Sequence, residues 1–245
     1  MFDYGIVIQA RASSTRLPNK VLMDIEGLPM LFRQVDRIKH FIPSVPVIVA
    51  TSNELSDDPI QELCEKKGID FYRGSLKNVV LRFIECADNF NLENIIRVGG
   101  DDPLIDSECC KALINSHKKE KKDFIYASSK EGWPYGTAAE LISKKSLEKI
   151  NFSTTNPLYR EHTIPYFFDN ADEFSIKKIK SPKSISRPDY YFTVDFPEDL
   201  KLIRNIFAAL KKEGDYFPFT KVIELIDDNK DILNINKHLH DGFSR

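Results

Sequence analysis

Short β-rich runs alternate with amphipathic stretches along most of this chain. The run Ile6-Val7-Ile8 is continuously apolar, as expected of a strand that is buried on both faces of a sheet. Strands are expected at Tyr4–Ala10, Pro46–Thr51, Asp70–Arg73, Asn94–Gly99, Asp123–Ser128, Phe174–Ile179 and Tyr190–Val194. The alternation predicts an α/β fold, with one Rossmann-like domain over residues 1–245 and a mostly parallel mixed sheet flanked by helices.

Between the strands, apolar residues recur at helical spacing. The sets that share a face are Leu31, Val35 and Ile38; Val79, Phe83 and Ala87; and Leu200, Ile203, Phe207 and Leu210. Asp57-Asp58-Pro59 is typical of a helix start, and Gly68 and Gly214 are expected to end helices.

The segment 132–188 interrupts this rhythm with prolines and interleaved aromatic residues. We interpret it as an insertion that carries acceptor-binding or dimer-forming elements. Trp133, Phe167 and Phe168 would offer apolar surface there, which favours a homodimer.

The overall composition gives no sign of a nucleic-acid or membrane partner. Basic and acidic residues nearly cancel, 35 against 37, so any anion site must be a local cluster. No run approaches the roughly 18 apolar residues of a membrane-spanning helix. The four cysteines form no CxxC pair, so we expect reduced thiols in a cytoplasmic protein.

The most informative stretch is Gln9–Lys20, directly after the first expected strand. Open α/β sheets bind ligands at this edge. Arg11, Arg16 and Lys20 lie close to Ser13-Ser14-Thr15, and cations with hydroxyl donors are the groups that a triphosphate requires. The stretch is not a Walker loop, because it lacks GxxxxGK[ST]. We interpret it as a phosphate-binding loop, the alternative being a solvated basic loop.

Two acidic clusters also follow expected strands. Gly99-Gly100-Asp101-Asp102 combines glycines with two carboxylates, and Asp195 follows Tyr190–Val194. Asp101 and Asp195 could together ligate Mg²⁺ that bridges phosphate oxygens. The alternative for Asp195 and Asp199 is capping of the following helix, the role that we expect for Asp199.

Together these clusters resemble the cytidylyltransferase family that includes CMP-sialic acid and CMP-KDO synthetases, and most of all its SpsF-like branch. The branch's motif QAR-x-GSTRLP-x-K-V-L is matched by Gln9–Leu22, with Ser13 in place of glycine. The matches extend over roughly residues 4–205. The weaker ones are Tyr72-Arg73-Gly74-Ser75, Val80-Leu81-Arg82, Gly100-Asp101-Asp102-Pro103, Gly136 with Glu140, Arg160-Glu161-His162 and Val194–Asp199.

The resemblance implies transfer of CMP from CTP to a small acidic acceptor, such as an acidic sugar for surface polysaccharide synthesis, with release of pyrophosphate. The implied nucleotide-binding residues are Gln9, Ala10, Arg11, Ser14, Thr15, Arg16, Lys20, Arg73, Gly74 and Gly100. Gly136, Glu140, Arg160 and His162 are implied for the acceptor, and Asp101 and Asp195 for the cofactor Mg²⁺. Arg11, Lys20 and Asp101 would be catalytic through charge neutralisation.

Two other functions remain open. A glycosyltransferase uses a related architecture but is expected to show an Asp-x-Asp motif, whereas Asp101 and Asp102 are adjacent. A non-catalytic nucleotide-binding protein of the same fold would have no need to retain both the cations and the carboxylates.

Overall fold

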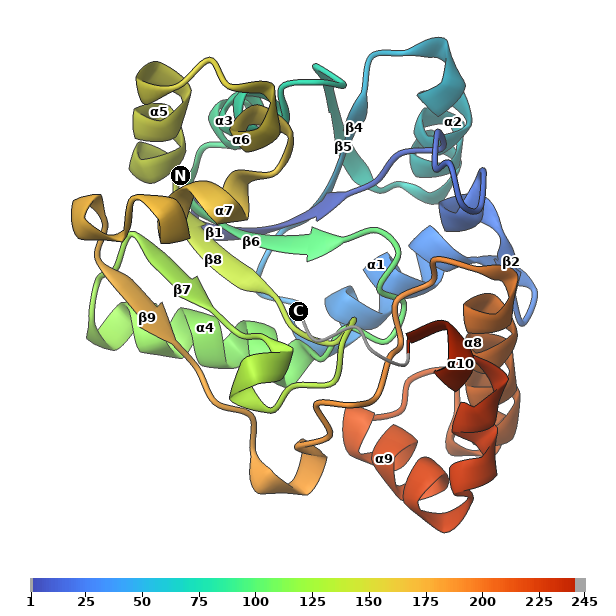
Figure 1. Ribbon diagram of the computed structural model, residues 1–245. Coiled ribbons are helices and arrows are strands. Elements are labelled where there is room, and N and C mark those ends of the chain that lie inside the picture. Colours follow the sequence, from blue (N-terminus) through green and yellow to red (C-terminus); the bar gives the residue numbers. More distant parts are fainter. Residues whose placement is uncertain (1, 241–245) are drawn as a thin grey trace.

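A mixed sheet of seven strands runs through the centre of the protein, as the computed structural model shows for residues 2–240 (Figure 1). Its spatial order is β5-β4-β1-β6-β8-β7-β9. The strands are β1 Phe2–Gln9, β4 Val47–Ser52, β5 Asp70–Gly74, β6 Leu92–Gly99, β7 Phe124–Tyr126, β8 Glu140–Ser143 and β9 Ile176–Lys178. The pairs among β5, β4, β1 and β6 are parallel, whereas β8 is antiparallel to both of its neighbours. The expected α/β fold with a mostly parallel mixed sheet is confirmed.

Helices cover both faces of this sheet (Figure 1). They are α1 Met30–Phe41, α2 Asp58–Lys67, α3 Val79–Asn89, α4 Ser107–Lys119, α5 Lys144–Ser153, α6 Pro157–Glu161, α7 Thr163–Asp169, α8 Pro197–Leu210, α9 Phe219–Asp228 and α10 Lys237–His240. The helices α1, α2, α4, α8 and α9 share one apolar core with the sheet, and α3, α5 and α7 share the other. No helix within residues 2–240 is both long and apolar enough to cross a membrane.

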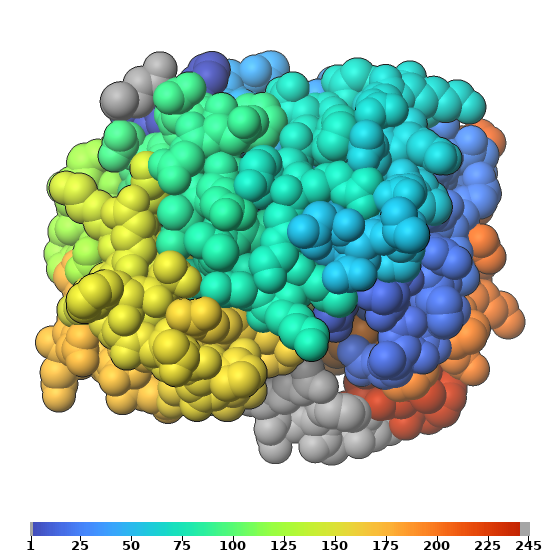
Figure 2. Space-filling model, turned by 90° about the horizontal axis from the view of Figure 1, so that it is seen from above, coloured from blue at the N-terminus to red at the C-terminus, as the bar shows by residue number. Residues whose placement is uncertain are grey.

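The first strand illustrates why the sheet has two cores. Side chains alternate along a strand, so Ile6 and Ile8 point into the first core and Val7 into the second. All three are fully buried, as expected from their continuous apolar run. Figure 2 looks down on the α3 face, where the yellow segment with α5 lies against the teal-green segment with α3, joined by a Lys144–Asp88 ion pair.

The prediction of one strand is wrong, and three short strands were not predicted. The stretch 190–194 forms only an isolated bridge, between Tyr135 and Tyr191. Its backbone groups bond to loops instead of a neighbouring strand: Phe192 N donates to Tyr135 O and Val194 N to Asp101 O. The strand β8 and the small hairpin of β2 Asp24–Ile25 and β3 Leu28–Pro29 were not expected, because such short runs carry little periodicity.

The segment 132–188 completes the central sheet. It supplies β8 and β9, together with the helices α5 to α7. The prediction that Trp133, Phe167 and Phe168 offer apolar surface was wrong for two of the three residues. Trp133 and Phe167 are 1% and 0% exposed, whereas Phe168 is 48% exposed. Trp133 Nε1 donates to Ile179 O, so its polar atom is satisfied inside the core.

Candidate active site

The loop after β1, residues 10–20, is held in place by the buried carboxylate of Asp57. Asp57 is fully buried, and its Oδ1 accepts a hydrogen bond from Ala12 N at 2.7 Å. Asn19 N donates to Ala12 O, which closes the loop on itself. Ser13 needs no left-handed backbone, because Asn19, Glu26 and Asn91 are the non-glycine residues with positive φ among residues 2–240. Serine therefore fits at this position without backbone strain.

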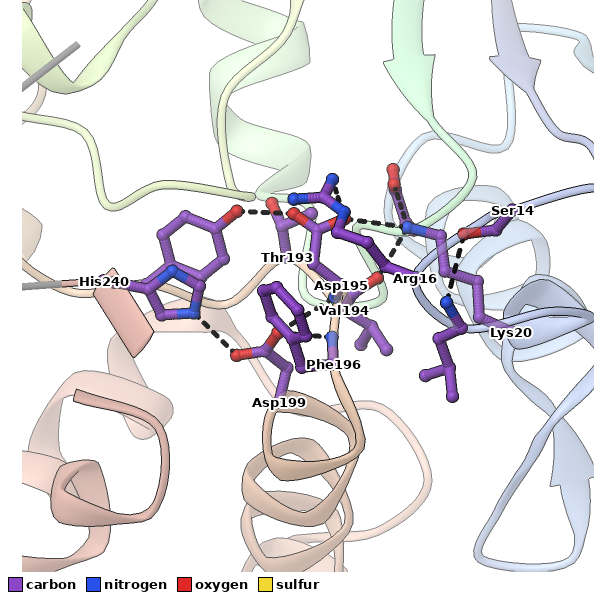
Figure 3. Close-up of polar contacts among 12 residues, drawn as sticks. Ser14, Arg16, Lys20, Thr193, Val194, Asp195, Phe196, Asp199 and His240 are labelled. Atoms are coloured by element: carbon purple, nitrogen blue, oxygen red, sulfur yellow. Dashed lines mark hydrogen bonds and ion pairs between the residues drawn. The ribbon is translucent and has the colours of Figure 1, made fainter. Parts of the chain in front are cut away.

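Lys20 joins this loop to both acidic clusters (Figure 3). Its Nζ donates to Asp101 Oδ2 at 2.7 Å, to Asp195 Oδ1 at 3.0 Å and to Val194 O at 2.7 Å. Arg16 Nη2 also donates to Asp195 Oδ1, at 2.6 Å. Two cations and two carboxylates from three separate segments thus meet at the carboxyl edge of the sheet.

The protonation states in this cluster follow from its charges. Burial alone would lower the pKa of Lys20, but Asp101 and Asp195 reverse this and hold it above its usual value. Burial alone would raise the pKa of Asp195, yet Lys20, the Tyr191 hydroxyl and Arg16 hold it below its usual value. Lys20 therefore stays cationic and Asp195 anionic, as an anion-binding and cation-binding edge requires.

The neighbouring Asp102 lies in a different environment. Burial and the nearby Asp101 raise its pKa, although Thr193 Oγ1 donates to its Oδ1 at 2.7 Å. Adjacent carboxylates in one turn thus differ in environment and in bonding partners, since Asp101 faces Lys20 and Asp102 bonds to the segment 190–194.

A cavity of about 720 Å³ opens beside the cluster. Arg16, Asp101 and Asp195 of the cluster are among the residues that line it, and so are the aromatic residues Tyr126, Phe168 and Tyr135. Arg97 and Glu140 also line it, and Arg97 Nη1 donates to Glu140 Oε2 at 3.0 Å, because the two residues are register partners on β6 and β8. An aromatic wall beside paired polar groups suits a small polar ligand with an apolar face.

Two glycines permit the close backbone approaches around this cavity. A side chain at Gly100 would lie 2.9 Å from Gln9 O, so a larger residue would push its turn away from β1. Gly136 has φ of +85°, and a side chain there would lie 2.5 Å from Thr193 N. Both turns thus depend on glycine to keep the cavity walls in place.

Comparison with known proteins identifies this arrangement. Residues 5–232 match the family described as Cytidylyltransferase. The chain belongs to the cytidylyltransferase family. It is therefore a nucleotidyltransferase, and the alternative of a non-catalytic nucleotide-binding protein falls away.

Three relatives of this cytidylyltransferase cover most of its length. The spore coat polysaccharide biosynthesis protein SpsF of Bacillus subtilis is 28% identical over 236 residues, 94% of this chain and 97% of SpsF. The 3-deoxy-manno-octulosonate cytidylyltransferase 2 of Hydrogenovibrio crunogenus is 29% identical over 180 residues, 71% of each chain. The solved cytidylyltransferase of Leptospira borgpetersenii has a TM-score of 0.86 at 27% identity, over 95% of this chain and 97% of its own.

Many of the site residues expected from the sequence lie at the sheet edge, in the cavity or on the loop between them. Gln9, Arg16, Lys20, Gly100, Asp101 and Asp195 gather at the carboxyl edge of the sheet, and Gly136 and Glu140 line the cavity beside them. Arg11 is half-exposed and pairs with Glu161 of α6 at 3.4 Å. Ala10 is buried at the end of β1, while Ser14 is partly exposed and Thr15 exposed on the loop.

Other expected residues are engaged elsewhere. Arg73 donates to Ser52 O and Glu54 O and pairs with Asp58 at 2.7 Å, which ties β5 to the start of α2. Gly74 ends β5 and is closely packed against Arg82. Arg160 Nε donates to Thr154 O, and His162 is exposed between α6 and α7; neither residue lines the cavity.

The roles of several residues near the site were not predicted from the sequence. Asp57 precedes the start of α2 as expected, but its side chain makes no cap bond and holds the loop at Ala12, a role that the sequence did not indicate. Tyr191 was interpreted as part of a core strand, but its hydroxyl donates to Asp195 Oδ2 at 2.8 Å. Arg97 lies only two residues before the glycine turn that was singled out, whereas nothing in the sequence links Tyr191 to Asp195.

Asp101 and Asp195 could supply two ligands to a divalent cation, so further ligands would have to come from a bound nucleotide. Asp101 and Asp195 both reach the single Lys20 ammonium, so their oxygens converge on one position. Within residues 2–240, no group of three or more His, Cys, Asp or Glu residues is arranged to hold a metal. Two carboxylates with phosphate oxygens are a usual ligand set for Mg²⁺, so the site fits a cation that arrives with a nucleotide.

Proposed function

We propose that this cytidylyltransferase transfers CMP from CTP to an acidic sugar or a related small acidic acceptor, with release of pyrophosphate. The observation that carries the proposal is the position of Lys20, which bonds to Asp101 and Asp195, two residues that line the 720 Å³ cavity. Phosphate-binding cations and a second substrate cavity therefore share one edge of the sheet. The names of SpsF and of the octulosonate cytidylyltransferase support a product used for polysaccharide synthesis.

The reaction is in-line attack of an acceptor oxygen on the α-phosphorus, with pyrophosphate as the leaving group. Arg11, Arg16 and Lys20 bind the triphosphate and neutralise the negative charge that develops on it. The rigid loop, held by the Asp57–Ala12 hydrogen bond, keeps these cations at fixed positions. Positioning and charge neutralisation are the main catalytic contributions that these residues can make.

Asp101 and Asp195 would hold Mg²⁺, the proposed cofactor. The bound cation would supply charge to the phosphate oxygens and lower the pKa of an acceptor hydroxyl. Lys20 would then donate to phosphate oxygens, because a second cation between the same carboxylates is repelled.

The cavity favours a sugar-like acceptor. Tyr126 and Phe168 offer flat apolar faces, and Glu140 offers a carboxylate that can accept hydroxyl hydrogen bonds. Lys130, which is exposed on the cavity wall, has a cationic group for the acceptor's acid function. Binding of the acceptor by Gly136 and Glu140 is part of this proposal. Arg160 and His162 stay predictions that require the acceptor to extend beyond the cavity.

A pyrophosphate-release screen tests the proposal. CTP and the other nucleoside triphosphates are each incubated with Mg²⁺ and a panel of ulosonic acids, other acidic sugars and sugar phosphates. We expect release with CTP and at least one acid. Glu140→Gln should raise KM for the acceptor and leave KM for CTP unchanged, while Lys145→Gln, on the exposed start of α5, serves as the control. Transfer of sugar from a nucleotide sugar, without pyrophosphate release from any triphosphate, would instead establish a glycosyltransferase.

A further inference from the structure

Asp195 is held at four points, only two of which belong to the triphosphate loop. Its Oδ1 faces Lys20 and Arg16 at 3.0 and 2.6 Å. Its Oδ2 accepts from the Tyr191 hydroxyl at 2.8 Å, and its backbone N donates to Asp199 Oδ2 at 2.9 Å. Tyr191 therefore sets the rotation of the carboxylate, and Asp199 sets the position of the backbone that carries it.

The two partners Tyr191 and Asp199 are themselves joined by the last described turn of the chain, and Figure 3 shows His240 of this turn beside Asp199. The His240 ring stacks on the Tyr191 ring with centroids 3.4 Å apart, and His240 Nε2 lies 2.8 Å from Asp199 Oδ1. Asn236 Nδ2 donates to the same Asp199 oxygen at 2.8 Å and to Tyr191 O at 3.1 Å. Both Asn236 and Asp199 are buried, so this junction is screened from water.

We infer that Asn236 and His240 form a carboxyl-terminal latch that positions Asp195 through Tyr191 and Asp199. The inference rests on the proposed function, in which Asp195 holds the divalent cation. The latch residues would be positioning residues, because Asn236 and His240 each contact both Tyr191 and Asp199, the two groups that orient Asp195.

Capping of helix α8 alone would not require the contacts that Asn236 and His240 make. The cap of α8 requires only Asp199 Oδ2, which accepts from Asp195 N and Phe196 N. Oδ1 adds nothing to that cap, yet it holds both latch residues. The stack on Tyr191 likewise serves no cap, but it limits the position of the phenol that donates to Asp195.

The state of Tyr191 is consistent with an orienting role. Its hydroxyl donates to Asp195 Oδ2, and its ring stacks on both His240 and Tyr135, with centroids 3.4 and 4.6 Å apart. Loss of the His240 ring would remove one of the two stacks that restrain the phenol, and so weaken the hydrogen bond that orients Asp195 Oδ2.

Direct binding of Mn²⁺, used as a spectroscopic substitute for Mg²⁺, tests the latch without any measurement of turnover. Electron paramagnetic resonance would measure free Mn²⁺ against folded protein at saturating CTP. We expect His240→Ala, Asn236→Ala and Tyr191→Phe each to weaken Mn²⁺ binding about tenfold, the usual cost of removing a group that orients a metal ligand. CTP affinity at saturating Mn²⁺ should change less than about twofold on the same reasoning, because the loop cations are untouched.

His238→Ala is the matched control, since His238 is an exposed residue on the same helix α10. His240→Gln, which keeps a donor toward Asp199, should recover part of the Mn²⁺ affinity that His240→Ala loses.

Three outcomes would contradict the inference or the proposed function. If the role of the latch is only structural, the variants will have lower melting temperatures but unchanged Mn²⁺ affinity per folded molecule, and this result would overturn the inference. If the wild-type protein releases pyrophosphate but all variants bind Mn²⁺ equally, the latch fails and the proposed function stands. If the wild-type protein binds no Mn²⁺ with CTP, both the latch and the metal site fail.

Discussion

Lys20 Nζ lies 2.7 Å from Asp101 Oδ2, across 81 residues of sequence, and the same ammonium also bonds to Asp195. It thereby neutralises the position on which the two carboxylates converge. Lys20 is only 7% exposed, so it is a structural cation of the unliganded protein as well as a proposed phosphate ligand.

Lys20→Met should consequently do more than weaken CTP binding. Removing one partner from a largely buried charge cluster costs on the order of 3 kcal/mol of stability, because the carboxylates left behind repel each other. Millimolar Mg²⁺ should raise the melting temperature of this variant more than that of the wild type, since the cation replaces the lost ammonium. Thermal melts with Mg²⁺ and with EDTA check this, and an equal shift in both proteins would contradict it.

Arg11→Ala separates ligand binding from stability more cleanly. The Arg11 side chain is 47% exposed and its Glu161 partner is 3.4 Å away, so the pair contributes little to folding. Loss of a charge-assisted phosphate contact should weaken CTP binding by about 1.5–3 kcal/mol, measured by calorimetry. Arg204→Ala, at an exposed position on α8, should leave CTP affinity unchanged. Equal CTP affinity in Arg11→Ala would remove Arg11 from the site.

Asp195 and Asp199 should respond differently to the same substitution. Asp195→Asn keeps the side-chain shape but removes one proposed metal ligand, so turnover should collapse while CTP binding weakens less. Asp199 is 1% exposed and accepts from four donors, so Asp199→Asn leaves one donor facing an amide and should cost about 1–3 kcal/mol of stability. Urea denaturation with steady-state kinetics checks both variants. Full turnover in Asp195→Asn would exclude it as a ligand.

His117 should make stability depend on pH. Burial and the nearby Lys121 lower its pKa, and its Nδ1 lies 3.0 Å from the Tyr4 hydroxyl. The unfolded chain therefore binds more protons than the folded protein below about pH 6.5, and stability falls as the pH drops through that window. Urea denaturation at pH 7.5 and 5.5 should show a smaller decrease for His117→Asn than for wild type. His238→Ala should retain the wild-type decrease.

The homodimer stays a prediction, now with different surface residues. Phe152 and Leu158 are 93% and 55% exposed on the neighbouring helices α5 and α6. Apolar side chains this exposed favour burial against a second copy. Light scattering should give twice the mass of one chain at micromolar concentration, and Phe152→Glu should shift the protein toward the monomer. A wild-type monomer at that concentration would refute the prediction.

Local sequence patterns were sufficient for most of the framework. The apolar run at Ile6-Val7-Ile8 identified the central strand, and helical spacing identified α1, α3 and α8, because side-chain periodicity follows directly from backbone geometry. The loop Gln9–Lys20 could be placed at the ligand edge for the same reason, since a strand's carboxyl end fixes where the following residues emerge. Asp101 was found by the glycine turn that precedes it.

Only the tertiary structure decided which of these groups meet. Asp195 was expected to end a strand, but it reaches Lys20 from an extended segment whose Val194 N bonds to the Asp101 turn. The pairing of Arg97 with Glu140 depends on the unexpected strand β8, and the stack of His240 on Tyr191 depends on how the last helices fold back. Periodicity reports the environment of one element at a time, whereas these contacts depend on the packing of elements that lie far apart in the sequence. Local sequence therefore determined most of the strands and helices and the position of the loop Gln9–Lys20, and the folded arrangement determined how the cations and carboxylates are paired.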